Sequence, residues 1–509
     1  MTARKKFFYN ATLLTVVALS VKTVNLAFSA FISRKIGAEA LGLYTLIGTV
    51  YAFAVTFATS GINLTVTRLV ASAVGEGKRG EISRIMRHAV GYALIFSSFA
   101  SLVLFFFAPY FSSAVLKDAR SEAALRALAV SLVPIAMSAV FSGYFIGVKK
   151  IVRSSVYQVS SQIFKIVITV VLVNRAANGG VAMATLALCI STTLGELFSF
   201  VLAFFQYLTA KKAKPPEKCE TEFSAITKMA LPLAFSAYIR SALLTLEHVL
   251  IPRRLLLYDD TEGAALASYG TLHGMALPVA LYPMSPLSSF ASLLVPEFAE
   301  SEARGDLSRL KRICEEVIAA TLKYAAPVAV FIYLFSEELA YCLYSSYSAG
   351  HHIAMLAPVI PIMYLDHVTD AMLKGIGEQV YSMWVNISDS FLSVFLIWFL
   401  LPKMGISGYA LVIVIMEGYN FLLSFIRLKK RVKFSLKSLF SFFLPFIEAA
   451  VSAFLADALF QFSGSLTTAP LLIAKMVFSL CIFFFLNLSL SLIIKKCIHP
   501  CKEKLSSLV

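Results

Sequence analysis

The sequence RGEISRI at positions 79–85 returns as RGDLSRL at positions 304–310, which is a separation of 225 positions. Two further pairs keep nearly this separation: Gly37-Ala38 matches Gly263-Ala264, and Gly147-Val148 matches Gly375-Ile376. Self-similarity at one fixed separation is the signature of an internal duplication. We therefore expect two copies of one structural unit within the 509-residue chain.

The composition places both copies in a membrane. Hydrophobic residues make up 59% of the chain and charged residues 15%, with a mean hydropathy of +0.79. A soluble globular protein is about half apolar and a quarter charged, so these values exclude a soluble enzyme. Since a bilayer-spanning helix needs about 20 apolar residues, about fourteen spans are predicted. They lie at 11–33, 44–74, 88–111, 123–148, 155–174, 181–209, 225–250, 268–298, 317–336, 351–373, 383–401, 408–427, 438–460 and 470–494.

This pattern predicts an all-α polytopic membrane protein whose two copies each hold six spans. Because six is even, both copies share one orientation, as in transporters with parallel repeats. We expect five parts in chain order. These are an N-terminal six-helix lobe (1–210), a cytoplasmic linker (211–224), a second six-helix lobe (225–431), a final helix pair (432–496) and a cytoplasmic tail (497–509).

The net charge of +16 reports orientation more than a binding partner. About 30 of the 45 basic residues fall in one set of alternate loops and about 8 in the other, and cytoplasmic loops are the ones that collect Lys and Arg. Both termini are therefore predicted to lie in the cytoplasm, with the chain crossing the cell membrane many times. The excess of basic over acidic residues therefore gives no reason to expect a nucleic-acid partner.

Two parallel halves are what alternating access requires, because the halves rock about a central site. The duplication therefore favours a transporter. A duplicated bundle without a transport role, such as a scaffold for cell-wall synthases, is the alternative reading.

Polar side chains inside the spans indicate where a central site lies. An ionised side chain at the bilayer centre costs roughly 2.5–3.5 kcal/mol on insertion scales. Lys22 stands in the middle of the first span, and Asn25 and Ser29 follow it at +3 and +7, on the same helix face. We expect this stripe to face a cavity.

Further polar residues extend the predicted cavity. In the seventh span Ser236, Arg240 and Glu247 share one face, with Arg240 near mid-depth. The second and fifth spans add Thr56, Ser60, Asn63, Thr67, Arg68 and Lys165. The predicted substrate-binding set is Lys22, Asn25, Ser29, Asn63, Arg68, Lys165, Ser236, Arg240 and Glu247.

Three of these residues have a purely structural alternative. Lys22 and Glu247 occupy equivalent places in the two copies, so they could form a buried ion pair. Arg68 lies near the cytoplasmic end of its span and could reach the lipid headgroups. The first five spans hold no Asp or Glu, and Glu196 in the sixth span is the first acidic residue that lies within a span. A basic first half favours an anionic substrate over a coupling cation.

Catalytic, metal and cofactor motifs are weak. Gly405-Ile406-Ser407-Gly408 resembles a nucleophile turn, yet nothing places a histidine beside Ser407. The tail offers Cys497, His499 and Cys501, which are three ligands where a structural zinc site uses four. We expect no enzyme activity, no metal and no cofactor.

Two motifs connect the chain to a known family. GINLTVTRLVA at 61–71 and LVPEFAE at 294–300, followed by Arg304-Gly305-Asp306, resemble the polysaccharide transporters of the multidrug/oligosaccharidyl-lipid/polysaccharide exporter superfamily. The resemblance is to the stage V sporulation protein B-like branch in particular, and it covers nearly the whole chain.

The resemblance implies a flippase that moves undecaprenyl-pyrophosphate-linked sugars across the cytoplasmic membrane. Its partners would be the polyprenyl-pyrophosphate-linked saccharide and membrane lipids, with cell-wall synthases as further candidates. Lys22 matches a basic cavity residue of the murein-precursor flippases, where those proteins carry Arg, and Phe28 stands where they place a second Arg. The rival within the same fold is a cation-coupled multidrug exporter.

Overall fold

The computed structural model describes residues 3–75, 80–148, 150–176, 179–210, 223–259, 261–434, 440–460 and 474–488. These residues form helices and connecting turns, and no strand occurs among them. The helices are α1 (Ala3–Thr59), α2 (Ile62–Gly75), α3 (Glu81–Phe106), α4 (Ala108–Tyr110), η1 (Phe111–Leu116), η2 (Ala119–Ser121), α5 (Glu122–Ala129), α6 (Leu132–Gly147), α7 (Ile151–Ala176), α8 (Gly180–Ala210), α9 (Phe223–Leu255), α10 (Glu262–Gly270), η4 (Thr271–Ala276), α11 (Leu277–Leu281), α12 (Met284–Ala303), α13 (Leu307–Leu334), α14 (Ser336–Tyr344), α15 (Ser348–Leu356), η5 (Ala357–Val359), α16 (Ile360–Gly375), α17 (Gln379–Val432) and α18 (Phe440–Phe460), with a last apolar helix at Ala474–Leu488.

The predicted spans coincide with these helices wherever the chain is described. Eight helices in the described part are long and apolar enough to cross a membrane, or nine if the bent pair α5–α6 is one span. Helix α17 covers two predicted spans, whereas α1 covers the first predicted span and the beginning of the second; the two helices are broken at Gly405 (φ 59°) and Gly37 (φ 81°), respectively. Glycine suits both breaks because positive φ is strained for other residues. The prediction of an all-α polytopic membrane protein is confirmed.

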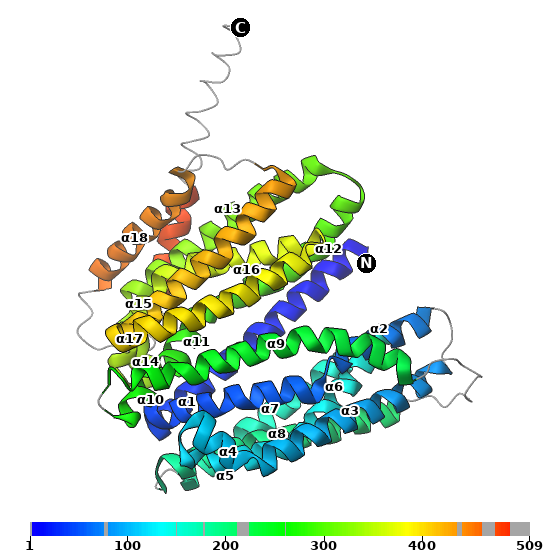
Figure 1. Cartoon of the computed structure of the whole chain (residues 1–509). Helices are drawn as coiled ribbons and strands as arrows, with labels where there is room; N and C mark the ends of the chain where they lie inside the picture. The colour runs from blue at the N-terminus through cyan, green and yellow to red at the C-terminus, as the bar shows by residue number, and fades with distance from the viewer. Residues whose placement is uncertain are drawn as a thin grey trace. The chain divides into compact units, whose positions relative to one another are not determined.

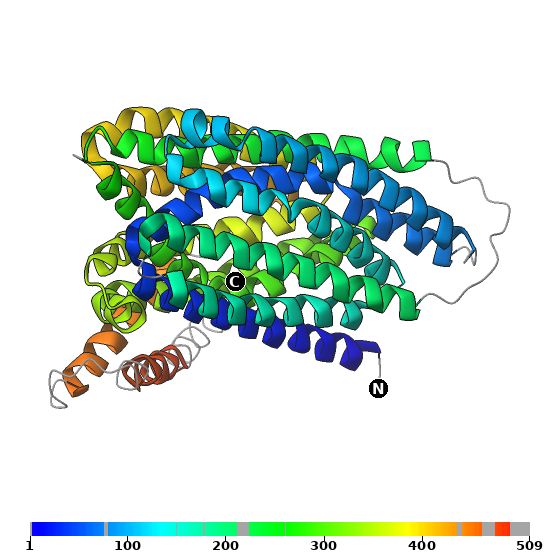
Figure 2. The same cartoon turned by 90° about the horizontal axis from the view of Figure 1, so that it is seen from below.

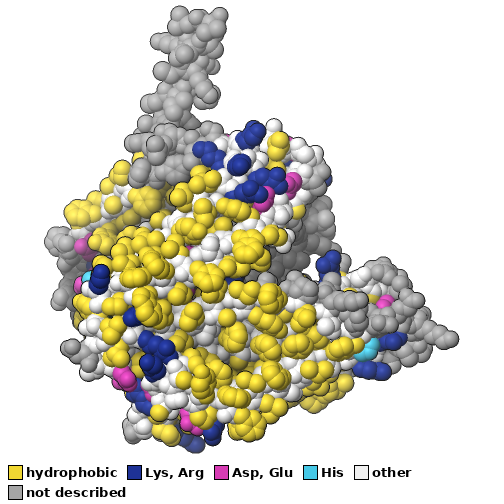
Figure 3. Space-filling view, viewed as in Figure 1, with side chains coloured by type: hydrophobic (Ala, Val, Ile, Leu, Met, Phe, Trp, Pro, Cys, Tyr) yellow, Lys and Arg dark blue, Asp and Glu magenta, His cyan; other side chains and the backbone are white. Residues whose placement is uncertain are grey.

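The described surface fits a lipid environment. Large hydrophobic side chains such as Phe99, Phe106 and Phe205 are more than half exposed. On the face shown in Figure 3, hydrophobic side chains predominate over charged ones. An apolar surface of this extent needs contact with lipid or protein, and the number of spanning helices points to lipid.

The chain forms two compact units, and these are assembled from separate stretches of sequence. Unit 1 comprises residues 1–30, 271–389 and 410–509, and unit 2 comprises residues 31–270 and 390–409. Both α1 and α17 therefore contribute to both units. The division differs from the lobes at 1–210 and 225–431, which remain a prediction from the repeat.

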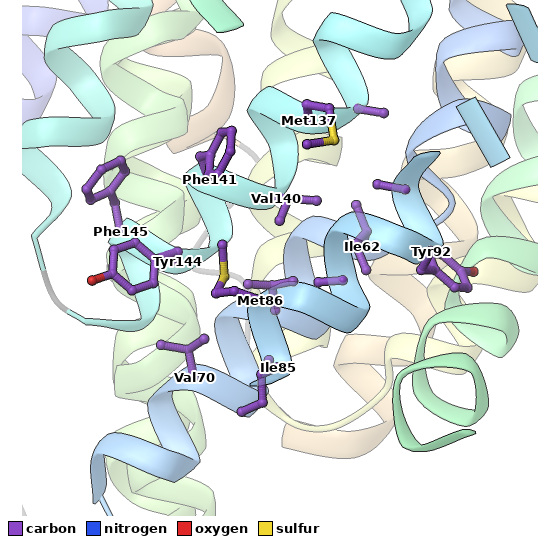
Figure 4. Close-up of a cluster of buried hydrophobic side chains, with 14 of the residues drawn as sticks. Ile62, Val70, Ile85, Met86, Tyr92, Met137, Val140, Phe141, Tyr144 and Phe145 are labelled. Atoms are coloured by element: carbon purple, nitrogen blue, oxygen red, sulfur yellow. The ribbon is translucent and has the colours of Figure 1, made fainter. Parts of the chain in front are cut away.

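Unit 2 contains a tightly packed core between α2, α3 and α6. The helices α6, α7 and α8 run alongside one another, with α3 next to α6 (Figures 1 and 2). Figure 4 shows Ile62 and Val70 of α2 with Met86 of α3 and Val140 of α6 in one buried cluster. A Cβ on Gly143 of α6 would lie 2.6 Å from the Asn63 carbonyl oxygen, so glycine permits this close approach.

Unit 1 is held at one helix end by a cluster of charges. The Glu378 carboxylate, which is about 10% exposed, accepts hydrogen bonds from Arg427 at 2.8 Å and from Arg431 at 2.6 Å. Glu378 stands in the turn between α16 and α17, outside the membrane-spanning segments. The two guanidinium groups, Arg427 first, lower the pKa of Glu378 from its ordinary value of 4.5.

We expect Glu378→Gln to destabilise the protein by about 1–2 kcal/mol at pH 7, because the amide loses the negative charge that strengthens the hydrogen bonds from Arg427 and Arg431. The effect stays moderate because both arginines remain partly exposed to solvent. Because the native pKa is depressed, the Glu378 contribution is complete above pH 4.5 and is lost as the pH falls through the native pKa. The gap in thermal midpoint between wild type and variant should therefore shrink below about pH 4.5.

The matched control is Glu316→Gln, which removes the partner of Arg312 in a solvent-exposed ion pair. Glu316→Gln should leave the thermal midpoint unchanged both at pH 7 and below about pH 4.5. A pH-independent gap for Glu378→Gln would contradict the assignment.

Candidate functional site

A ladder of hydroxyl groups joins α1 to α9 in unit 2. The Thr245 hydroxyl donates to the Thr49 carbonyl oxygen at 3.2 Å, and the Thr56 hydroxyl donates to the Ser241 hydroxyl at 3.3 Å. The next contact along the helices is the hydrogen bond between the Ser60 and Tyr238 hydroxyls. Thr56 and Ser60 were predicted to line the cavity, and the structure engages both in helix–helix contact. A helix of the first copy thus packs against the first helix of the second copy.

Ser60 also marks a break within the predicted second span. Its φ is 44° and that of Gly61 is 70°, so α1 ends at Thr59 and α2 begins at Ile62. The Ser60 side chain is fully buried, and its hydroxyl lies 2.9 Å from that of Tyr92 on α3. Sequence reasoning missed this break, although the dipeptide Ser60-Gly61 is a turn signal. The break lets α2 take its own direction toward α6.

The two predicted residues on α2 are placed differently. Asn63 is half-buried, and its carbonyl oxygen accepts a 2.8 Å hydrogen bond from the Thr67 hydroxyl. Arg68 is exposed and has no ion-pair partner among the residues that the structure describes. Five positions separate Asn63 from Arg68, which places them on different faces of α2.

Arg240 lies at the centre of α9. It is the eighteenth of 33 residues, so about 25 Å of helix extends on either side, in a bilayer whose hydrocarbon core is about 30 Å thick. Its side chain is exposed, next to the ladder residue Ser241. Within the described part of the chain, no carboxylate pairs with Arg240.

Glu247 stands two turns beyond Arg240 and is half-buried. Its carboxylate accepts a 2.7 Å hydrogen bond from the Ser393 hydroxyl of α17. The carboxylate also acts electrostatically on the hydroxyls of Tyr269 and Tyr409. Glu247 therefore has one hydroxyl donor on α17 and interacts electrostatically with tyrosines of α10 and α17, a set that sequence reasoning did not assemble.

Lys165 has an acidic neighbour that sequence reasoning did not assign to it. On α7 it packs so closely against α8 that a Cβ on Gly195 would lie 3.0 Å from the Lys165 Cβ. Its ammonium charge acts on the Glu196 carboxyl and the Cys189 thiol. Lys165 stands 14 residues before Gly179 and Glu196 stands 16 residues after Gly180, so counting from this turn between α7 and α8 would have placed the two within about one helical turn of each other.

Ser29 belongs to unit 1 and is also engaged. Its hydroxyl donates to the Gly274 carbonyl oxygen of the π-helix η4 at 3.0 Å. The side chains of Lys22, Asn25 and Ser236 lie outside the described residues, so their predicted roles stay predictions. Of the predicted set, the structure leaves Arg68 and Arg240 as exposed basic groups and ties Ser29, Lys165 and Glu247 to neighbouring groups.

Carboxylates gather in unit 1. Asp366 of α16 and Asp389 and Glu417 of α17 act on one another electrostatically. Asp370, one turn after Asp366, pairs with Lys374 at 2.5 Å and accepts from Ser382. Within the described ranges, no three His, Cys, Asp or Glu side chains stand close enough together to hold a metal ion.

Solved structures of transporters share this fold. Over 97% of this chain and 99% of the other, the structure superposes on a lipid II flippase MurJ in an inward closed conformation, with a TM-score of 0.68 and 13% identity. It also superposes on an inward-facing multidrug resistance MATE family transporter of the MOP superfamily, with a TM-score of 0.66, 15% identity, and coverage of 82% of this chain and 98% of that one.

Curated relatives come from Bacillus subtilis (strain 168). Stage V sporulation protein B is 24% identical over 90% of each chain. The lipid II flippase MurJ is 22% identical over 80% of this chain and 79% of its own length. These similarities confirm the family resemblance drawn from the motifs at 61–71 and 294–300.

Family models give the same assignment. Residues 265–399 match the MatE model. Residues 7–302, more than half of the chain, match the model described as polysaccharide biosynthesis protein. The chain is therefore a multi-pass membrane protein that belongs to the polysaccharide biosynthesis protein family.

Proposed function

We propose that this protein translocates a polyprenyl-pyrophosphate-linked saccharide across the cytoplasmic membrane by alternating access. The observation that carries the proposal is Arg240, an exposed guanidinium at the centre of α9, the helix that contains the predicted seventh span, with no carboxylate partner in the described part of the chain. A permanent positive charge at this depth calls for water or an anion beside it. A pyrophosphate supplies oxygen atoms that a guanidinium binds with two parallel hydrogen bonds.

Other residues of the predicted substrate-binding set have roles that follow from their side-chain chemistry. Arg68 and Lys22 supply further positive charge for the phosphates, and Asn25, Asn63 and Ser236 supply amide and hydroxyl groups for sugar hydroxyls. The polyprenyl chain stays in lipid, so only the polar headgroup needs a hydrated path. Translocation forms and breaks no covalent bond, so no catalytic residue is required.

Relatives support the same substrate class. One curated relative and one solved neighbour carry the name lipid II flippase. The proposed orientation, with both termini in the cytoplasm, places the basic loops on the side where anionic lipid surfaces retain them.

A second candidate, a cation-coupled exporter, is favoured by the acidic residues of unit 1. Asp366, Asp389 and Glu417 interact through their charges, and carboxylates within membrane spans mark ion and proton pathways. The fold of a multidrug transporter is also shared.

Transport in vesicles separates the two candidates. The purified full-length protein is reconstituted into liposomes that contain a fluorescent polyprenyl-pyrophosphate-linked disaccharide, and a membrane-impermeant quencher reports its arrival in the outer leaflet. We expect accelerated exchange of the labelled lipid and no efflux of a cationic dye under a proton or sodium gradient. Dye efflux without lipid exchange would identify the exporter instead.

A further inference from the structure

Unit 1 contains a groove of about 540 Å³ that the proposed transport function does not use. It lies between the end of α13, the first turn of α14, and α18, and it opens on the surface of the unit. Leu334 and Phe335 line one side, and Val451 and Phe454 of α18 line the other. The groove therefore lies between α13, which is long and apolar enough to span a membrane, α18, which contains a predicted span, and the start of α14.

Most of the groove wall is apolar. Phe335 is only 2% exposed and belongs to the buried cluster with Phe331 and Ala453, whereas Phe454 is 73% exposed at the rim. Ala450 and Ala453 present small side chains where α18 borders the groove, which leaves room between the larger ones. A wall of this kind on spanning helices suits a hydrocarbon chain.

One end of the groove is charged. Glu338 in the first turn of α14 and Asp457 near the end of α18 both line it. The Asp457 carboxylate forms a 3.0 Å ion pair with Lys475 of the last helix, while Glu338 has no ion-pair partner among the side chains that the structure describes. The groove lining thus offers two carboxylates, and the Lys475 ammonium, which is not part of the lining, stands beside one of them.

These charges lie where α13 and α18 end, which is the level at which lipid headgroups meet a membrane protein. A headgroup that fits them carries a positive group with N–H donors for Glu338 and Asp457 and a phosphate for Lys475. An anionic headgroup would meet an unpaired carboxylate, and a quaternary ammonium has no N–H to donate.

We propose that this groove binds a phospholipid with a primary-ammonium headgroup, that is, phosphatidylethanolamine. One acyl chain lies along Phe335, Val451 and Phe454, the ammonium group meets Glu338 and Asp457, and the phosphate faces Lys475. The test measures lipid binding and not transport, so its outcome does not depend on the proposed function.

Native mass spectrometry of the delipidated full-length protein tests the headgroup. Phosphatidylethanolamine, phosphatidylglycerol and phosphatidylcholine with identical acyl chains are titrated in turn. We expect the first lipid to bind about tenfold more tightly than the other two, because its ammonium makes charge-assisted hydrogen bonds. Glu338→Gln should reduce this preference to about twofold. Glu337→Gln, in the same helical turn but outside the groove lining, is the matched control and should keep it.

A second pair of variants tests the acyl-chain path. Ala450→Trp fills the groove and should weaken binding of all three lipids about equally. Ile447→Trp, at an exposed position of α18 outside the groove lining, should leave binding as in wild type. Three results would overturn the proposal, provided that Glu338→Gln and Ala450→Trp retain the wild-type thermal midpoint. Phosphatidylglycerol could bind as tightly as phosphatidylethanolamine, or Glu338→Gln could keep the full preference. The third result is that Ala450→Trp binds lipid as tightly as wild type.

Discussion

Arg240→Ala is expected to slow transport of a lipid-linked saccharide by at least about tenfold, because it removes charge-assisted hydrogen bonds that contribute about 1.5–3 kcal/mol each. The guanidinium stands at the centre of α9, exposed and without a carboxylate partner in the described part of the chain. Nothing in the described packing relies on it, so the variant should fold. The measurement is the rate at which a fluorescent lipid-linked disaccharide reaches the outer leaflet of liposomes.

Two further variants define the role of Arg240. Arg240→Lys keeps the charge but loses the fork geometry that matches a phosphate, so its rate should lie between those of wild type and Arg240→Ala. Arg312→Ala removes a solvent-exposed arginine that pairs with Glu316 on its own helix, and it should transport at the wild-type rate. Wild-type transport by Arg240→Ala, at equal reconstitution, would remove Arg240 from the proposed site.

The largest effect on stability is expected for Gly42→Ala. Helices α1 and α10 approach so closely that a Cβ on Gly42 would lie 2.1 Å from the Leu266 carbonyl oxygen, and one on Gly270 would lie 2.2 Å from the Ala38 carbonyl oxygen. The obstacle in each case is backbone, which cannot rotate away as a side chain can. The helices must separate, at a cost of at least about 3 kcal/mol, the upper part of the range for overpacked cores.

Gly48→Ala provides the control within the same helix. A Cβ at that position would meet nothing within 4 Å, and alanine favours helix over glycine. Thermal midpoints in one detergent should therefore fall sharply for Gly42→Ala and stay level or rise for Gly48→Ala. Equal midpoints for both variants would contradict the backbone contact between α1 and α10.

The helices could be predicted from sequence because a membrane span is a local property. About 20 apolar residues suffice to identify one, whatever lies beside it. The same criterion hid the break at Ser60-Gly61, since a window of apolar residues runs across it without interruption. Backbone conformation at a single residue depends on partners, here Tyr92 and Tyr238, that a window cannot include.

The candidate site was harder to predict because its partners are distant in sequence. Glu247 meets Ser393, and Ser29 meets the Gly274 carbonyl oxygen, at separations of 146 and 245 positions. Lys165 and Glu196 lie on the consecutive helices α7 and α8, and counting residues from the turn between them would have predicted that the two are neighbours. Helical periodicity predicts which residues share one face of a helix, but it does not predict which other helix that face contacts.

The sharing of α1 and α17 between the two compact units has a consequence for how the gene can be divided. A chain cut within 211–222 would leave residues 1–30 of unit 1 on the first fragment and residues 223–270 of unit 2 on the second. Neither fragment would encode a whole unit. Coexpressed halves would have to contribute helices to each other to complete either unit, so the boundary of the sequence duplication is not a boundary between the compact units.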